Sequence, residues 1–114
     1  MKYEMTKEQN VAVVKLQGSL DVSLQKELRE VLVKITHASE KDLIIDFSSV
    51  TFIDSSCLGT LVSLAKNLRE RRGDIKLTGL SDDVRSIFQI TRLDRVFDIH
   101  DSNEEAIAGF YKPQ

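Results

Sequence analysis

The segment 53–59, Ile-Asp-Ser-Ser-Cys-Leu-Gly, places a carboxylate, two hydroxyls and a thiol in consecutive positions. It stands between an expected strand and an expected amphipathic helix. Asp and Ser are favoured N-cap residues, so capping alone could account for them. One cap satisfies only one or two of the free N–H groups, however, and here three candidates follow one another. An exposed hydroxyl at the positive end of a helix also accepts a phosphate readily. The segment therefore predicts either a plain helix cap or a site of phosphorylation.

Catalytic constellations are otherwise scarce in this sequence. His37 and His100 are the only histidines, and neither has a neighbour at metal-ligand spacing. Asp42 and Asp46 flank an expected strand, but paired acids at that spacing are common. No phosphate-binding loop, dinucleotide-binding glycine motif or serine nucleophile elbow occurs. With Cys57 as the single thiol, we expect no metal, no organic cofactor and no enzymatic activity.

A basic cluster near residue 70 offers a second candidate site. It could attract a phosphate group, although such a run more often solvates the end of a helix and complements its dipole. The cluster comprises Lys66, Arg69, Arg71 and Arg72.

Composition limits the classes of partner and compartment. The chain has 114 residues with 16 basic and 18 acidic side chains, a net charge of −2. This length favours a single domain over residues 1–114, and the near-balance of charge argues against direct nucleic-acid binding. A single cysteine suits a reducing compartment. The polar first ten residues resemble no secretory signal, and no apolar run is long enough to insert into a membrane, so we expect a cytoplasmic protein.

Hydrophobic periodicity predicts alternating strands and helices. Short β-branched or apolar runs predict strands at 2–6, 11–16, 43–47, 75–78 and 96–99. Helical spacing of apolar residues predicts a helix from Leu24 through 35, capped by Asp21 or Ser23, and another from Asp54 to Gly73. Ser81 and Ser102 should open two shorter helices. We expect residues 48–52 to be turn-like and Gly73 to form a left-handed C-cap.

Alternation of this kind implies right-handed crossovers between parallel strands. The predicted fold class is a small α/β domain, with a mixed, largely parallel sheet of about four to five strands and about four helices. Such folds carry many activities, so the fold alone does not identify the function.

Two motifs give the chain a family resemblance. Residues 54–59, Asp-Ser-Ser-Cys-Leu-Gly, resemble the D-S-[ST]-G-[LIV]-G signature of STAS-domain anti-sigma-factor antagonists. Residues 16–21, Leu-Gln-Gly-Ser-Leu-Asp, resemble the L-x-G-x-L-D pattern of the same family. The resemblance extends over roughly residues 3–108. The departure is Cys57, which stands where the family usually has glycine or alanine and adds a thiol that could be redox-sensitive.

The resemblance implies a partner-switching cycle. The first serine of the signature, Ser55 here, is the residue that an anti-sigma factor with serine kinase activity phosphorylates. The unphosphorylated antagonist binds the anti-sigma factor and frees the sigma factor. The phosphorylated form does not bind, and a PP2C-type phosphatase resets it. The residues that the resemblance assigns to shaping the site or binding the partner are Asp21, Asp54, Ser56, Cys57, Leu58 and Gly59.

Two other functions remain open at this point. The chain could be a STAS module of another regulatory or transport complex, or a small nucleotide-binding protein, although the absence of a phosphate loop disfavours the latter. For Gly59 we expect a close helix or strand neighbour, so that a β-branched replacement would overpack the contact.

Overall fold

The sheet of this protein follows the order of the chain. The computed structural model describes residues 1–37 and 41–111, and within them five strands pair in the order β1-β2-β3-β4-β5. Strand β1 is antiparallel to β2, whereas every later neighbour is parallel. The strands are β1 (Tyr3–Glu8), β2 (Val11–Leu20), β3 (Asp42–Ile53), β4 (Asp74–Thr78) and β5 (Asp98–His100). The predicted mixed, largely parallel sheet is confirmed.

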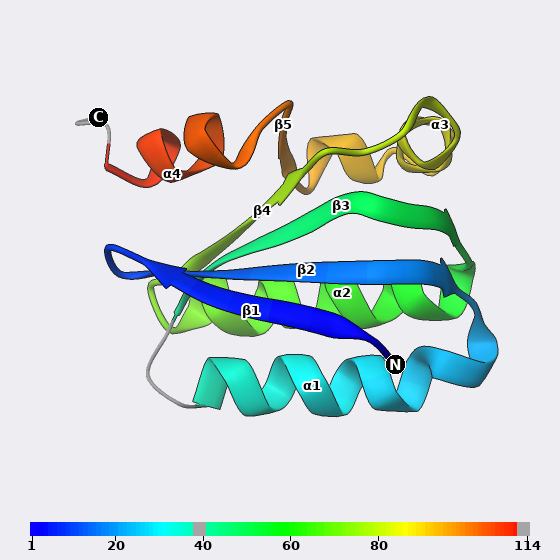
Figure 1. The fold of residues 1–114 in the computed structure, drawn as a ribbon, viewed down its shortest axis with the longest axis horizontal. Coiled ribbons are helices and arrows are strands. Elements are labelled where there is room, and N and C mark those ends of the chain that lie inside the picture. The colour runs from blue at the N-terminus through cyan, green and yellow to red at the C-terminus, as the bar shows by residue number, and fades with distance from the viewer. Residues whose placement is uncertain (38–40, 112–114) are drawn as a thin grey trace.

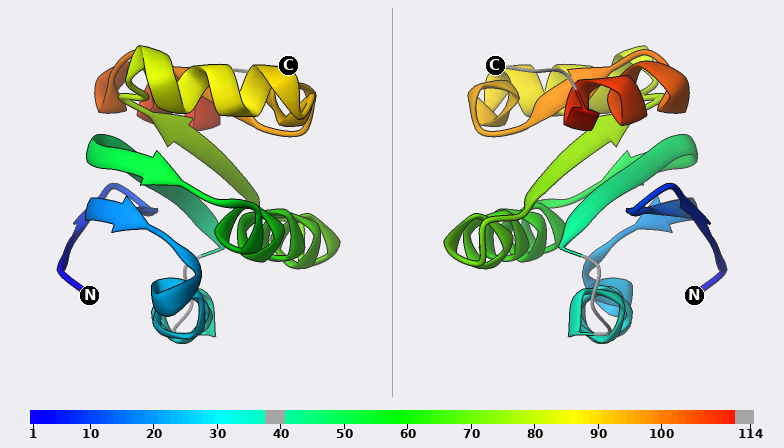
Figure 2. Two further views of the ribbon diagram at one scale, coloured as in Figure 1. Left: turned by 90° about the vertical axis from the view of Figure 1, so that its right-hand side faces the viewer. Right: turned by 90° about the vertical axis from the view of Figure 1, so that its left-hand side faces the viewer.

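Helices connect the parallel strands, as parallel pairing requires. Among the described residues the connecting helices are α1 (Gln25–His37), α2 (Ser55–Glu70) and α3 (Asp82–Ile90), and α4 (Asn103–Tyr111) follows the last strand. Short 3₁₀ turns, Val22–Leu24 and Leu93–Arg95, precede α1 and β5. Figures 1 and 2 show α1 and α2 side by side below the sheet, with α4 on the opposite side. The expected four helices are confirmed.

Two hydrophobic clusters hold these layers together. The larger one lies between the sheet and helices α1, α2 and α3, and it includes Phe47, whose ring meets that of Phe88 edge-on with centroids 6.0 Å apart. The smaller one packs Ala106 and Ile107 of α4 against Val11, Val13 and Ile44. Side chains alternate between the two faces of a strand, and β2 and β3 contribute residues to both clusters. Both strands are therefore apolar on both faces, as is typical of strands in the middle of a sheet.

Strand β3 is longer than the sequence predicts. The residues expected to form a turn after Phe47 continue the strand as far as Ile53. Val50 and Ile53 are buried while Thr51 and Phe52 are exposed, so burial in this stretch departs from the strict alternation of a regular strand. Strand β2 is likewise extended to Leu20, with register shifts near Gly18 that mark a bulge. These extensions carry both strands to the starts of their following helices.

Smaller boundary differences occur at two other elements. Leu24 closes a 3₁₀ turn, and the α-helix begins one residue later. The last strand begins at Asp98 rather than at Val96, because Val96 still belongs to the end of a 3₁₀ turn. The caps at Ser81 and Ser102 are as predicted, since their hydroxyls accept hydrogen bonds from the amides of Val84 and Glu105.

The C-terminus of α2 corrects the prediction for Gly73. The left-handed residue is Arg72, with φ of 64°, and not Gly73. The amide of Arg72 donates to the Arg69 carbonyl at 3.2 Å, and the amide of Gly73 donates to the Leu68 carbonyl at 2.7 Å, the paired bonds of a Schellman motif. Glycine is needed at 73 for another reason: a Cβ there would lie 2.0 Å from the carbonyl oxygen of Lys41.

This geometry predicts opposite effects for two neighbouring substitutions. Gly73→Ala should destabilise the fold by about 3 kcal/mol, because backbone must move to admit the methyl group. Arg72→Gly should stabilise it by about 0.5–1 kcal/mol, because glycine adopts positive φ without steric cost. Urea unfolding of both variants measures these changes. The account fails if Arg72→Gly proves the more damaging of the two.

A partly buried ion pair joins β4, β5 and α4. Lys76 is only 7% exposed, and its Nζ lies 2.8 Å from Oδ2 of Asp98 and 5.0 Å from the ring centroid of Phe110. The hydrogen bond from Lys76 holds the pKa of Asp98 below its ordinary value. The carboxylate therefore stabilises the folded state in its charged form.

The sign of this shift predicts an acid-dependent contribution to stability. Asp98→Asn should lower the free energy of unfolding by about 1 kcal/mol at neutral pH. This is the contribution of a hydrogen bond to a charged group, reduced because Asp98 is exposed to solvent. A lowered folded pKa means that the stabilisation is complete above about pH 3.9 and is lost as the pH falls through the folded value. Urea unfolding across a pH series should therefore show the two proteins converging in acid. A difference that stays constant down to pH 2 would contradict this assignment.

Candidate functional site

The carboxyl ends of β2 and β3 bring two aspartates to one edge of the sheet. Leu20 and Ile53 are paired in register, and Asp21 and Asp54 follow them directly. The amide of Asp54 donates to the carbonyl of Leu20 at 3.0 Å, and this hydrogen bond holds the ends of β2 and β3 together. Residues that are 33 positions apart in the sequence thus share one site.

Each aspartate caps the helical segment that follows it. Oδ1 of Asp21 accepts from the amide of Ser23 at 3.0 Å. Oδ1 of Asp54 accepts from the amide of Cys57 at 3.1 Å and from the hydroxyl of Ser56 at 2.6 Å. The hydrogen bond from Ser56, followed by the one from Cys57, holds the pKa of Asp54 below its ordinary value. The site therefore carries a fixed negative charge near neutral pH.

The two serines of the segment have different surroundings. Ser56 is partly buried and its hydroxyl donates to Asp54. Ser55 is exposed at the first position of α2, and its hydroxyl bonds to none of the residues that the structure describes. Of the two, Ser55 is the hydroxyl that an enzyme can reach without breaking an existing hydrogen bond.

Cys57 and Leu58 shape the site from the inside. Cys57 is 0% exposed, and its Sγ lies 3.5 Å from the carbonyl oxygen of Asp21. Burial, with a smaller contribution from Asp54, raises the pKa of the Cys57 thiol, so the thiol stays protonated and poorly reactive. Leu58 is 5% exposed and belongs to the main core. Both side chains contribute packing beneath the helix start.

Gly59 corrects the expectation of a tight contact. It is exposed, and a Cβ built on it would meet nothing within 4 Å. The overpacking predicted for a β-branched replacement is therefore wrong. Gly59 follows Ser55 by one helical turn, on the same side of α2. A side chain at 59 would enlarge the surface beside the Ser55 hydroxyl without disturbing the core.

Two exposed apolar residues at this edge were missed by the sequence analysis. Val22 is 71% exposed directly after Asp21, and Phe52 is 45% exposed two residues before Asp54. Extending the strand past Phe47 with a period of two would have placed Phe52 on the exposed face, although Val50 and Thr51 depart from that period.

The remaining sequence candidates have structural roles or lie elsewhere. Arg69 donates to Asp74 and to the carbonyl of Val96, and Arg71 donates to the carbonyl of Thr36, so half of the basic cluster ties α2 to its surroundings. His37 ends α1 and His100 ends β5, on separate elements.

A small polar hollow of about 170 Å³ lies where β3 and β4 meet the start of α4. Asp46 there accepts from the Ser48 amide at 2.8 Å and from Nδ2 of Asn103 at 3.0 Å, while Thr78 donates to Oδ1 of Asn103. Burial works to raise the pKa of Asp46, but the hydrogen bonds from Ser48 and Asn103 outweigh it and lower the pKa. These groups satisfy one another and anchor α4.

The part of the chain that the structure describes contains neither a metal-binding cluster nor a membrane-spanning helix. Within residues 1–37 and 41–111, no three His, Cys, Asp or Glu side chains lie close enough to hold a metal ion. In the same ranges, no helix has the length and apolar character to cross a membrane.

The open surroundings of Gly59 predict that a small side chain stabilises α2. Gly59→Ala should raise the free energy of unfolding by about 0.5–1 kcal/mol, because alanine restricts the unfolded chain and has space in the folded one. Chemical denaturation of the variant, beside Gly73→Ala as the crowded counterpart, measures this. A decrease in stability for Gly59→Ala would contradict the open surroundings of Gly59.

Comparison with known proteins agrees with this geometry. The sequence pattern of the STAS domain family matches residues 2–106. An anti-sigma-B factor antagonist of Staphylococcus aureus is 29% identical over 104 residues, covering 91% of this chain and 96% of the relative. The crystal structure of an anti-sigma factor antagonist from Mycobacterium paratuberculosis has a TM-score of 0.86 at 22% identity, covering 95% of this chain and 92% of the other.

A further solved structure concerns a modified relative. The Bacillus cell fate determinant SpoIIAA in its phosphorylated form superposes with a TM-score of 0.72 at 23% identity, over 96% of this chain and 99% of that one. The family pattern spans nearly the whole chain, and the resemblance seen in the two motifs is confirmed. The chain belongs to the STAS domain family.

Proposed function

We propose that this protein is a non-catalytic regulator that binds an anti-sigma factor and is switched off by phosphorylation of Ser55. The observation that carries the proposal is the contrast between the two serines: Ser55 is exposed and without a hydrogen-bond partner among the described residues, and Ser56 is bound to Asp54. The family supports the choice of partner, because relatives across the whole chain are named as anti-sigma factor antagonists.

The surface around Ser55 suits a protein partner. Val22 and Phe52 expose apolar area at the same edge of the sheet, and Gly59 leaves the helix surface flat beside the hydroxyl. Exposed apolar groups rimmed by polar ones are typical of interaction sites. The unphosphorylated protein thus offers a neutral hydroxyl at the edge of the sheet that also exposes these apolar side chains, and the anti-sigma factor covers it.

Phosphorylation changes this surface through charge and bulk. A phosphate on Ser55 adds about −1.5 to −2 charges beside the carboxylate of Asp54. The N-terminus of α2 stabilises negative charge, so the fold itself is retained. A partner packed against the hydroxyl then meets repulsion and steric conflict. A loss of about 2.8 kcal/mol weakens binding a hundredfold, so no conformational change is required.

The enzymes of the cycle follow from the same proposal. The anti-sigma factor itself carries the serine kinase activity, and a PP2C-type phosphatase removes the phosphate in the reducing cytoplasm. Asp21 and Asp54 surround the hydroxyl with negative charge, which contributes to recognition of the unmodified form.

Substitutions at the two serines test the proposal. Ser55→Ala should abolish phosphorylation by the partner kinase, because no acceptor oxygen remains, and should still bind the anti-sigma factor. Ser55→Asp should fold, since an acid is favourable at a helix N-terminus, and should bind at least tenfold more weakly. A phosphate-affinity gel, together with calorimetric binding to the anti-sigma factor that co-purifies with the chain, measures both effects.

Ser56→Ala is the matched control. Its hydroxyl points to Asp54, so the variant should remain a kinase substrate, with only a loss of stability from the missing hydrogen bond. Continued phosphorylation of Ser55→Ala, or unchanged affinity of Ser55→Asp, would show that Ser55 is not the switch.

A further inference from the structure

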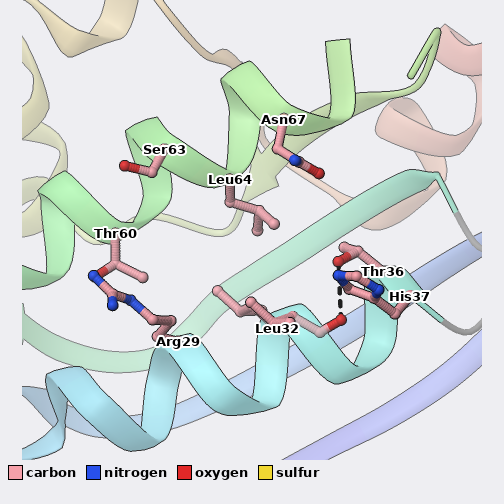
Figure 3. A pocket seen from close by; sticks show the side chains of 9 residues that line it. Arg29, Leu32, Thr36, His37, Thr60, Ser63, Leu64 and Asn67 are labelled. Atoms are coloured by element: carbon pink, nitrogen blue, oxygen red, sulfur yellow. Dashed lines mark hydrogen bonds between the residues drawn. The ribbon is translucent and has the colours of Figure 1, made fainter. Parts of the chain in front are cut away.

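A groove runs between α1 and α2, apart from the Ser55 site. Its volume is about 210 Å³, and the residues lining it come from 29–37 of α1 and 60–67 of α2. Figure 3 shows Leu32 from α1 and Leu64 from α2 projecting into the space between the two helices. None of the residues assigned to the phosphorylation switch lines this groove.

The floor of the groove is apolar and short. Leu32 and Leu64 are 1% and 7% exposed, and they close the bottom against the main core. Val33, which is 43% exposed, extends the apolar surface toward solvent. Three side chains of this size accommodate a compact apolar group, and they are too few for the long stripe that a docking helix presents.

The rim of the groove is polar, and no carboxylate lines it among the residues that the structure describes. Arg29 and His37 are its ionisable residues, and Ser63 and Asn67 face them from α2. The side chains of Arg29, Ser63 and Asn67 form no hydrogen bond or ion pair with the residues that the structure describes. Thr60, by contrast, accepts from Gln25 and donates to the carbonyl of Ser56, so it is already satisfied.

From this arrangement we propose that the groove binds a small organic monocarboxylate with a compact apolar body. The Arg29 guanidinium takes the carboxylate, since its planar fork matches two carboxylate oxygens. The apolar body lies over Leu32, Val33 and Leu64, and the free donors of Ser63 and Asn67 complete the polar side. The volume of about 210 Å³ is somewhat larger than the roughly 150 Å³ of an apolar cavity that holds benzene, so a ligand of about eight heavy atoms fits the groove.

Hexanoate is the probe for this proposal, because it combines a carboxylate with a short apolar chain. Titration of the ¹⁵N-labelled full chain, followed by NMR amide shifts, should show saturable changes at residues 29–37 and 60–67. For a ligand of this size we expect a dissociation constant of about 1 mM. Hexanol, which has the chain without the charge, should bind about tenfold more weakly.

Two substitutions on α1, each removing one positive charge, distinguish binding in the groove from a general attraction between hexanoate and a basic surface. Arg29→Gln should weaken hexanoate binding about tenfold, because the carboxylate loses its bidentate partner. Lys34→Gln is the matched control: it removes the same charge from an exposed position of α1 that does not line the groove, and it should bind as the parent does.

The contrary outcomes are equally definite. Equal binding of hexanoate and hexanol, an equal loss in both charge variants, or shifts outside the two helices would overturn the proposal. Shifts at 29–37 and 60–67 that depend on protein concentration, without any effect of hexanoate, would assign the groove to a second copy of the chain and also overturn it. The result is independent of the phosphorylation assay, because the two sites share no residue.

Discussion

The parallel pairing of β2 with β3 is the constraint on which the site depends. The pairing runs to Leu20 and Ile53, and the Asp54 amide closes it on the Leu20 carbonyl. Because both strands end at the same level, the two aspartates that follow them emerge side by side, and both helical segments start there. A shift of one residue in this register would move Leu43, Ile45 and Phe47 of β3 away from the main core, so the core itself maintains the site.

Capping and function use the same few atoms. The Asp54 carboxylate satisfies the Cys57 amide and also holds the Ser56 hydroxyl, which leaves only Ser55 facing solvent. Beneath them, Cys57 fills the space against the Asp21 carbonyl and keeps its thiol protonated by burial. Because the N-terminus of a helix favours negative charge, the proposed phosphate on Ser55 would require no rearrangement of the fold. The proposed switch is therefore a change of surface and not of fold.

At two glycines, the role expected from the local sequence differs from the role that the tertiary structure gives them. Gly73 occupies the place where helix-ending rules predict a left-handed glycine, yet Arg72 adopts that conformation and Gly73 instead makes room for the Lys41 carbonyl. Gly59 occupies a place where crowding was expected, and it faces open space. The sequence thus marks a special position correctly at Gly73 and wrongly at Gly59. The physical reason lies in a neighbour 32 residues away in one case, and in the lack of any neighbour within 4 Å in the other.

The sequence by itself determined the order of strands and helices, the caps at Asp54, Ser81 and Ser102, the fold class and the family, because periodicity, capping chemistry and short motifs are local properties. Only the tertiary structure decided that β3 continues past Phe47, since its second half pairs with β2 as far as Ile53. It also decided which of the two serines has no partner among the described residues, and that the Cys57 thiol is buried. The same holds for the groove between α1 and α2 and for its Arg29, which pairs with none of the described residues. Those properties arise from contacts between segments distant in the chain, which no local pattern records.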